Sequence, residues 1–170
     1  MKKLFAPWRS EYSNDVTAGK QEEAQPQSCA FCKQLAQNKD QSNFILKRFK
    51  HSFVMLNKYP YNAGHLLVLP IKHVSALSEL SKEERTELME LTNLSIDILY
   101  KSLKNDGLNA GFNLGKAAGA GIPSHLHMHV LPRWQGDTNF MPTIAETKVI
   151  SFDLAQLYKQ LKPEFDKITL

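Results

Sequence analysis

The sequence predicts an α+β fold in which a largely antiparallel sheet is covered by helices. Short apolar runs bounded by turn residues are typical of strands, and apolar residues at helical spacing recur after residue 81 and again after residue 152. The chain has 170 residues, 42% of them hydrophobic, which is the size of a single domain with a substantial core. We therefore expect one domain over residues 29–170, preceded by an N-terminal arm and mobile loop over residues 1–28.

The start of the chain predicts neither a signal peptide nor a membrane anchor. Residues 1–6 begin like a signal peptide, but a proline, a tryptophan and an arginine follow and end the apolar run far too early. No apolar stretch approaches the ~20 residues that are needed to cross a bilayer. Residues 13–28 are polar and are interrupted by Gly19 and Pro26, as in a mobile loop. We expect a cytoplasmic protein without a membrane partner.

Three strands are predicted in the first half of the domain. Residues 44–50 and 52–57 are short runs that contain several aliphatic and aromatic side chains, as strands usually do. Residues 58–64 contain a proline and a glycine and predict a turn. The apolar run 65–70 follows this turn directly and completes the set.

A long helix, two further strands and a terminal helix are predicted in the second half. Ser81 and Glu84 have the spacing of a capping box, and the apolar residues that follow fall on one helical face as far as Leu103. Residues 105–107 end this helix, and residues 108–113 and 125–131 supply the remaining strands. A terminal amphipathic helix is indicated by Phe152, Leu154, Leu157, Leu161 and Phe165.

The most informative feature for function is the alternation of histidine with apolar residues. His125, His127 and His129 stand at every second position, so a strand places three imidazoles on one face and the intervening apolar residues on the other. A solvated histidine ladder and a zinc pair of the His-x-His kind are the alternatives. Residues 111–123 before this run are small and rich in glycine, so their backbone N–H groups can approach a phosphate. The combination favours a phosphate site.

This run, with the small-residue loop before it and a Pro-Arg-Trp sequence after it, resembles the signature of the histidine-triad (HIT) superfamily. Residues 5–9, 118–121 and 134–142 resemble more narrowly the bacterial branch that includes diadenosine tetraphosphate phosphorylases and related hydrolases. The resemblance implies a mainly antiparallel five-stranded sheet with a long helix and a C-terminal helix. It also implies a homodimer whose sheets join across the interface.

The resemblance assigns the chemistry to two of the histidines. His127 is implied to be the nucleophile that attacks the α-phosphate of a nucleotide and forms a nucleotidyl-histidine. His129 would donate a hydrogen bond to the phosphate or to the leaving oxygen, and nearby backbone N–H groups would stabilise the developing charge. No metal is required for this displacement. The candidate nucleotide-binding residues are Asn57, Asn113, Gly121, Ile122, Ser124 and Trp134.

Some of these binding candidates have ordinary structural explanations as well. Asn57 and Asn113 align with ligand-contacting positions of the family, but taken alone they are turn residues. Trp134 and Trp8 each present a flat indole face for stacking on a nucleobase, and ordinary packing is the alternative. His65 begins an apolar strand, and a structural role in the core is expected for it.

A second candidate site is a structural zinc centre. Cys29 and Cys32 form a C-x-x-C pair, which supplies half of a tetrahedral shell. The resemblance implies that His73 and His125 complete it, so that zinc anchors the end of the catalytic segment. Two reduced thiols beside a hydrogen-bonded His73 are the alternative, and a redox pair is a weaker one.

The predicted function is cleavage of dinucleoside polyphosphates, by phosphorolysis or hydrolysis of diadenosine tetraphosphate, through a nucleotidyl-histidine. The net charge of +4 favours an anionic ligand, and because the basic residues are scattered we expect no duplex nucleic acid as a partner. A nucleoside phosphoramidase or an adenylyl-lysine hydrolase is the enzymatic alternative. A nucleotide-binding module with little turnover is the alternative from another class.

Overall fold

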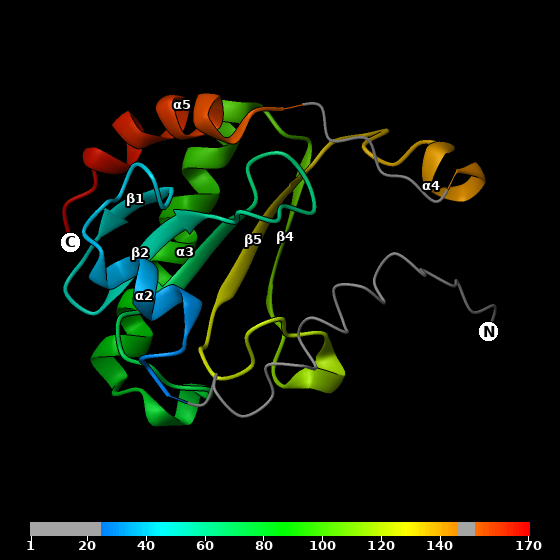
Figure 1. Cartoon of the computed structure of the whole chain (residues 1–170). Coiled ribbons are helices and arrows are strands. Elements are labelled where there is room, and N and C mark those ends of the chain that lie inside the picture. The colour runs from blue at the N-terminus through cyan, green and yellow to red at the C-terminus, as the bar shows by residue number, and fades with distance from the viewer. Residues whose placement is uncertain (1–24, 146–151) are drawn as a thin grey trace.

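The computed structural model describes residues 25–145 and 152–170, and its centre is one sheet with the strand order β1-β2-β3-β5-β4 (Figure 1). All neighbouring strands are antiparallel, as predicted. Most of the N-terminal arm, including Trp8, lies outside the described residues, whereas residues 25–28 form a turn. The strands are β1 (Ile45–Arg48), β2 (Ser52–Leu56), β3 (Leu66–Pro70), β4 (Gly107–Phe112) and β5 (Met128–Arg133).

The two predicted helices are present, and the first has the expected cap. The Ser81 hydroxyl accepts a hydrogen bond from the Glu84 N–H at 3.2 Å, and the Glu84 carboxylate accepts one from the Ser81 N–H at 2.6 Å, which confirms the capping box. Asp153 caps the terminal helix. The helices are α2 (Ala30–Ala36), α3 (Lys82–Leu103), α4 (Met141–Ile144) and α5 (Leu154–Asp166), with short 3₁₀ turns η1 (Leu77–Glu79) and η2 (Lys116–Ala118).

The sheet is covered on both faces, which explains why β2 and β3 are buried along their whole length. Helices α3 and α5 pack on one face and the short helix α2 lies over the other (Figure 1). The larger core therefore lies between the sheet and the two long helices, and includes Leu56, Val68, Leu91, Val130, Leu161 and Phe165. A smaller cluster under α2 comprises Cys29, Phe31, Ile45, Phe53, Met55, Leu67 and Leu69.

The histidine run enters the sheet later than predicted. The strand β5 begins at Met128, so His125 and His127 precede it and only His129 lies within it. The expected start at residue 125 is wrong because the backbone before Met128 forms hydrogen bonds outside the sheet. The Leu126 N–H, for example, donates to the Val74 carbonyl at 2.6 Å. Nevertheless, the apolar residues between the histidines point into the larger core, as the alternation predicted.

The described helices do not provide a membrane span. Within residues 25–145 and 152–170, no helix combines the length and the apolar composition needed to cross a bilayer. The longest of them, α3, has charged residues along its exposed side and buries only one face.

Candidate active site and metal centre

His127 is buried, 7% exposed, and its hydrogen bond fixes where its proton resides. Its Nδ1 lies 2.7 Å from the His125 carbonyl oxygen. Because a carbonyl only accepts, Nδ1 must carry the proton and Nε2 keeps a free lone pair. Burial lowers the pKa of His127, although the hydrogen bond to the His125 carbonyl acts in the opposite direction. The imidazole is therefore neutral at pH 7 and its Nε2 is available as a nucleophile.

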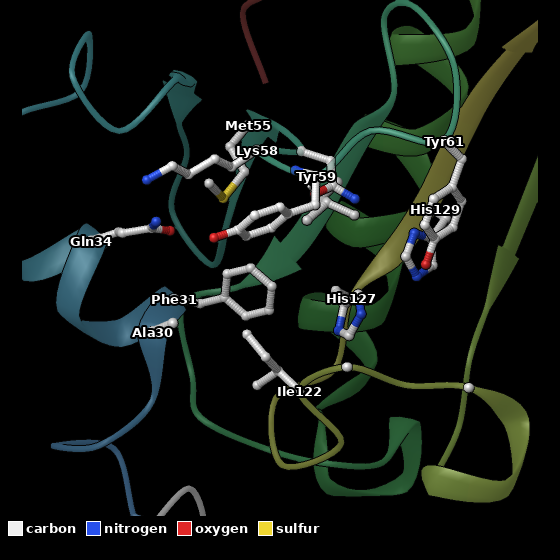
Figure 2. Close-up of a pocket in the computed structure, with 14 residues that line it drawn as sticks. Ala30, Phe31, Gln34, Met55, Lys58, Tyr59, Tyr61, Ile122, His127 and His129 are labelled. Carbon is white, nitrogen blue, oxygen red and sulfur yellow. Dashed lines mark hydrogen bonds between the residues drawn. The ribbon is translucent and has the colours of Figure 1, made fainter. Parts of the chain in front are cut away.

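A cavity of about 450 Å³ opens beside this imidazole (Figure 2). His127 and His129 lie at one end of it, and Gln34 and Lys58 lie at the other, with the Phe31 ring between them. Most of the wall is apolar, supplied by Ala30, Phe31, Met55, Leu67 and Ile122. An apolar cavity with a few polar groups at its ends is typical of a small-molecule site.

A chain of hydrogen bonds sets the tautomer of His129. The Tyr61 N–H donates to His65 Nδ1 at 3.1 Å, so the proton of His65 is on Nε2. That N–H donates to His129 Nδ1 at 2.9 Å, which leaves the proton of His129 on its Nε2. The Asn113 side-chain amide lies 3.5 Å from this Nε2. His129 therefore presents a hydrogen-bond donor at the same end of the cavity as the free lone pair of His127.

His65 and His129 are both neutral because both are buried. Burial lowers the pKa of His129 to about 4, and the neighbouring His127 adds to the shift. Burial likewise lowers the pKa of His65 to about 3, with His129 and His127 as the smaller causes. A second proton on either ring would repel its neighbours, so the donor and acceptor roles stay fixed at neutral pH.

His65 has a contact with the candidate site that sequence reasoning did not anticipate. It was expected to be structural, and it is fully buried, but its Nε2 also contacts His129, and Asn57 Nδ2 lies 3.3 Å from its Nδ1. The Tyr61 ring stacks on His129 with 5.8 Å between ring centroids. A histidine directly before an apolar strand was the available signal, but the pairing of β3 with β5 that brings it to His129 is not visible in sequence.

The four predicted metal ligands converge. One ligand atom from each of Cys29, Cys32, His73 and His125 lies within 4.8 Å of the others, so this cluster could hold a metal ion. Cys29 Sγ and Cys32 Sγ lie 3.4 Å and 3.5 Å from His125 Nδ1. The other ring nitrogen of His125 lies 2.9 Å from the Pro70 carbonyl oxygen and must donate to it. The Nδ1 lone pair is thus aimed at the thiols, as in metal sites with an oriented histidine.

Helix α2 joins the metal cluster to the cavity. Cys29 precedes the helix and Cys32 lies in its first turn, while the Phe31 ring between them turns toward the histidines. The Phe31 ring centroid is 5.6 Å from that of His125 and 5.3 Å from that of His127. A change in the position of the thiols therefore changes the wall of the cavity.

The remaining predicted binding residues are not all brought to the cavity. Asn57, Gly121 and Ile122 line it. The Ser124 hydroxyl oxygen is buried and has no hydrogen-bond partner among the described residues. Trp134 directly follows β5 at the end remote from His127 and is not among the residues that line the cavity.

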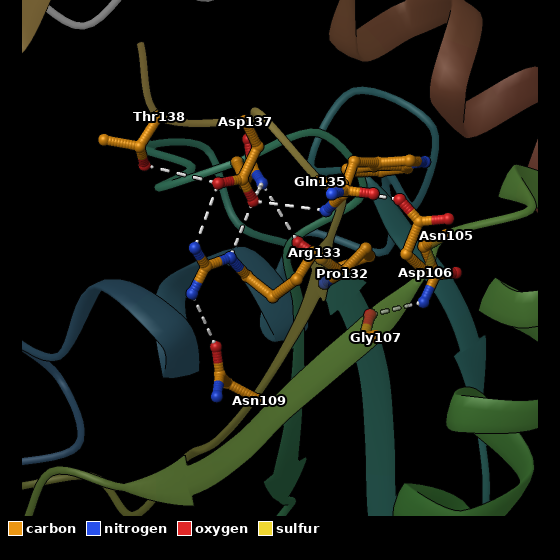
Figure 3. A network of polar contacts seen from close by, with 11 residues as sticks. Asn105, Asp106, Gly107, Asn109, Pro132, Arg133, Gln135, Asp137 and Thr138 are labelled. Carbon is orange, nitrogen blue, oxygen red and sulfur yellow. Dashed lines mark hydrogen bonds and ion pairs between the residues drawn. The ribbon is translucent and has the colours of Figure 1, made fainter. Parts of the chain in front are cut away.

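A polar network surrounds Arg133 and Asp137 at the end of β5 (Figure 3). Asp137 accepts hydrogen bonds from Arg133 Nε at 2.6 Å and from Asn62 Nδ2 at 2.7 Å. The hydrogen bond from Arg133, with the Trp134 N–H and the Arg133 charge as smaller causes, keeps the pKa of Asp137 well below its usual range. Asn62 Nδ2 also donates to the Pro132 carbonyl at 3.0 Å. The turn between β2 and β3 is thereby tied to the end of β5, which positions Tyr61 beside His129.

Comparison with known proteins adds independent information. A family model described as HIT domain matches residues 38–136. A Mycobacterium tuberculosis protein named AP-4-A phosphorylase is 35% identical over 150 residues, covering 88% of this chain and 77% of the relative. A Schizosaccharomyces pombe protein named asymmetrical bis(5'-nucleosyl)-tetraphosphatase is 30% identical over 115 residues, covering 67% of this chain and 63% of the relative.

The fold also matches solved structures. A Zn-bound histidine triad family protein from Mycobacterium smegmatis superposes with a TM-score of 0.68 at 24% identity. The match covers 84% of this chain and 96% of that chain. Thus the arrangement of strands and helices found here is that of histidine triad proteins.

Proposed function

Because this chain belongs to the HIT domain family, we propose that it is an enzyme that cleaves dinucleoside polyphosphates, with diadenosine tetraphosphate as the substrate. The names of the M. tuberculosis and S. pombe relatives support this substrate class. The observation that carries the proposal is the orientation of His127, whose Nδ1 proton is held by the His125 carbonyl while its Nε2 is free at the cavity. A binding module would not need a nucleophile in this state.

The reaction has two displacements. His127 Nε2 attacks the α-phosphorus, an N–P bond forms, and the P–O bond to the remaining polyphosphate breaks. In the second step an acceptor oxygen attacks the same phosphorus, and the N–P bond breaks to regenerate His127. The Nε2–H of His129 donates to a phosphate or leaving oxygen, and backbone N–H groups of Gly121 and Ile122 stabilise charge on the other oxygens. Each such donor is typically worth about 3 kcal/mol in the transition state.

We assign the other predicted binding residues, apart from Trp134, to positioning the nucleotide in the cavity. Asn57 holds His65 and lines the cavity, so we assign it to the ribose side of the nucleotide. Asn113 lies beside His129 and is assigned to the phosphates. Ser124 is assigned to the phosphate-binding loop, whereas Trp134 lies away from the cavity and is given no role in it.

We further propose that inorganic phosphate is the preferred acceptor, as the name of the M. tuberculosis relative supports. Phosphate attack on adenylyl-His127 yields ADP together with ATP, whereas water yields AMP together with ATP. Chromatography of the products of diadenosine tetraphosphate cleavage, with labelled phosphate present at millimolar concentration, distinguishes them. We predict label in ADP. AMP and ATP as the only products would contradict the phosphorylase assignment, and no cleavage at all would contradict the proposed function.

Zinc is the metal that the ligand set favours. Two thiolates and two imidazole nitrogens form a closed tetrahedral shell of the kind found in structural zinc sites. Cys29, Cys32, His73 and His125 would hold the ion, which would fix the segment leading to His127 and contribute folding free energy. The displacement at phosphorus uses only the imidazole of His127 and hydrogen-bond donors. Reduced thiol ligands fit a cytoplasmic location.

A homodimer is also proposed, with the strand β4 as its joining edge. β4 is the last strand of the sheet, and three consecutive residues, Asn109, Ala110 and Gly111, are exposed. An uncovered edge of this kind can pair with a second copy. The other outer strand, β1, is in contact with α5, and its Lys47 Nζ donates to the carbonyls of Asp166 at 2.9 Å and Ile168 at 2.6 Å.

A further inference from the structure

The amide of Gln34 is a polar group in the cavity that the reaction does not use. Gln34 lies in α2 and lines the cavity. Its Oε1 is buried and has no hydrogen-bond partner among the described residues. A buried acceptor without a partner is unfavourable, so rotation of this amide toward a hydrogen-bond donor on a ligand in the adjoining cavity is favoured.

The position of Gln34 indicates which part of the ligand supplies that donor. Gln34 is one helical turn beyond Phe31, and the two side chains lie on one face of α2. Phe31 packs against His127, and Gln34 lies on the other side of the Phe31 ring from the histidines (Figure 2). This inference rests on the proposed function: if the α-phosphate is at His127, the nucleobase extends toward Gln34.

The apolar part of the wall does not discriminate between bases, and Lys58 and Tyr59 supply an ammonium and a hydroxyl in place of an amide. Phe31, Met55 and Ile122 present apolar surfaces that accept the face of any base. The other amide of the cavity, Asn57, is already engaged: its Oδ1 accepts from the Tyr59 N–H at 2.9 Å, and its Nδ2 lies 3.3 Å from His65 Nδ1. Gln34 is therefore the amide that remains for the edge of the base.

We infer that Gln34 is a specificity-determining residue that recognises adenine. Its Oε1 accepts a hydrogen bond from the 6-amino group, and its Nε2 donates to the neighbouring ring nitrogen, which is the pairing that glutamine forms with adenine. A base with a 6-oxo group would place an acceptor against Oε1. A base without the amino group would leave Oε1 buried and unpaired, which weakens binding about tenfold.

Nucleoside monophosphates test the recognition of the 6-amino group by Gln34 directly, because they bind without being cleaved. Calorimetry compares AMP with purine riboside 5'-monophosphate, which lacks only the 6-amino group. The wild-type protein should prefer AMP about tenfold. In Gln34→Met, which keeps the length of the side chain but loses the amide, the two affinities should become equal. Gln34→Glu, which keeps an acceptor, should retain the preference, and the exposed Gln41→Met serves as the matched control.

Several outcomes would overturn the assignment. If the wild-type protein bound AMP and purine riboside 5'-monophosphate equally well, the assignment would be wrong, and this comparison needs no variant. An unchanged preference for AMP in Gln34→Met would also overturn it. A second pair, GMP and IMP, differs only in a 2-amino group. A preference for GMP that disappears in Gln34→Met would show that Gln34 recognises a different amine. Absence of binding by all four nucleotides, with no cleavage of diadenosine tetraphosphate, would instead reject the proposed function together with this inference.

Discussion

At the scale of single residues, the candidate site depends on which nitrogen of each histidine carries the proton. His127 and His129 could be predicted from their alternation in the sequence. Their tautomers could not, because the partners that set them are a backbone carbonyl and His65, which is 64 residues away from His129. For the same reason the sequence concealed the role of His65 itself. The spacing in the sequence identifies the histidines, whereas the position of each proton depends on hydrogen-bond partners that come together only in the folded chain.

The buried state of His65 predicts how stability depends on pH. Its folded-state pKa is lowered to about 3, whereas an unfolded histidine titrates near 6.5. Below pH 6.5 the unfolded chain therefore binds a proton that the folded chain does not, and the free energy of unfolding falls as the pH falls. Between pH 7 and pH 5 the wild-type protein should lose about 2 kcal/mol more than His65→Asn in urea denaturation.

The control for this measurement is Gln41→Asn, at an exposed residue outside the site that carries no titratable group. Its pH dependence should match that of the wild-type protein. Equal losses of stability in the wild-type protein and His65→Asn would contradict the burial of a neutral His65.

At the scale of elements, the long helices and the strands were predictable and the short helix was not. The capping box and apolar periodicity indicate α3, and each strand was located to within a few residues. By contrast, α2 has seven residues, which is two turns and too short for a clear period. Its place is set by packing of Phe31 and by the convergence of its thiols with two histidines. Such long-range contacts cannot be identified from local sequence.

The turn before β3 requires a glycine. Gly64 has a φ of +70°, and a Cβ at this position would lie 2.4 Å from a methyl group of Leu103 and 3.3 Å from Pro132. Gly64→Ala should therefore destabilise the protein by about 2 kcal/mol, measured by urea denaturation. In Gly111→Ala, the control, no atom lies within 4 Å of the new methyl group. Its effect should be within about 0.5 kcal/mol, and equal effects of the two changes would contradict the strained turn.

We expect zinc to affect both the stability of the protein and the binding of substrate, because two of its ligands lie at the start of α2. Metal analysis should find one zinc ion per chain in the wild-type protein and loss of it in Cys29→Ser, with Ser28→Ala as the adjacent control. A strong chelator should lower the melting temperature of the wild-type protein and raise KM, because Phe31 on α2 forms part of the cavity wall. Substoichiometric zinc that is unaffected by Cys29→Ser would reject the metal centre.

At the scale of the whole molecule, the cavity is assembled from segments that are distant in the chain. Helix α2, the turn between β2 and β3, the glycine-rich loop around residue 121 and the histidine run each contribute to it. The family resemblance supplied the overall fold and the identity of the central histidines. The base end of the cavity, with Phe31 and Gln34, was missed because its residues carry no motif and meet the histidines only through the fold.

The central claim is that His127 forms a covalent bond to the nucleotide. The direct measurement is the intact mass of the protein after brief mixing with diadenosine tetraphosphate and a quench without acid, which preserves the N–P bond. We predict an added mass of one adenylyl group on the wild-type protein, and none on His127→Ala or on His127→Asn, although the asparagine variant should still bind AMP. Turnover near the wild-type rate in His127→Ala would contradict the mechanism.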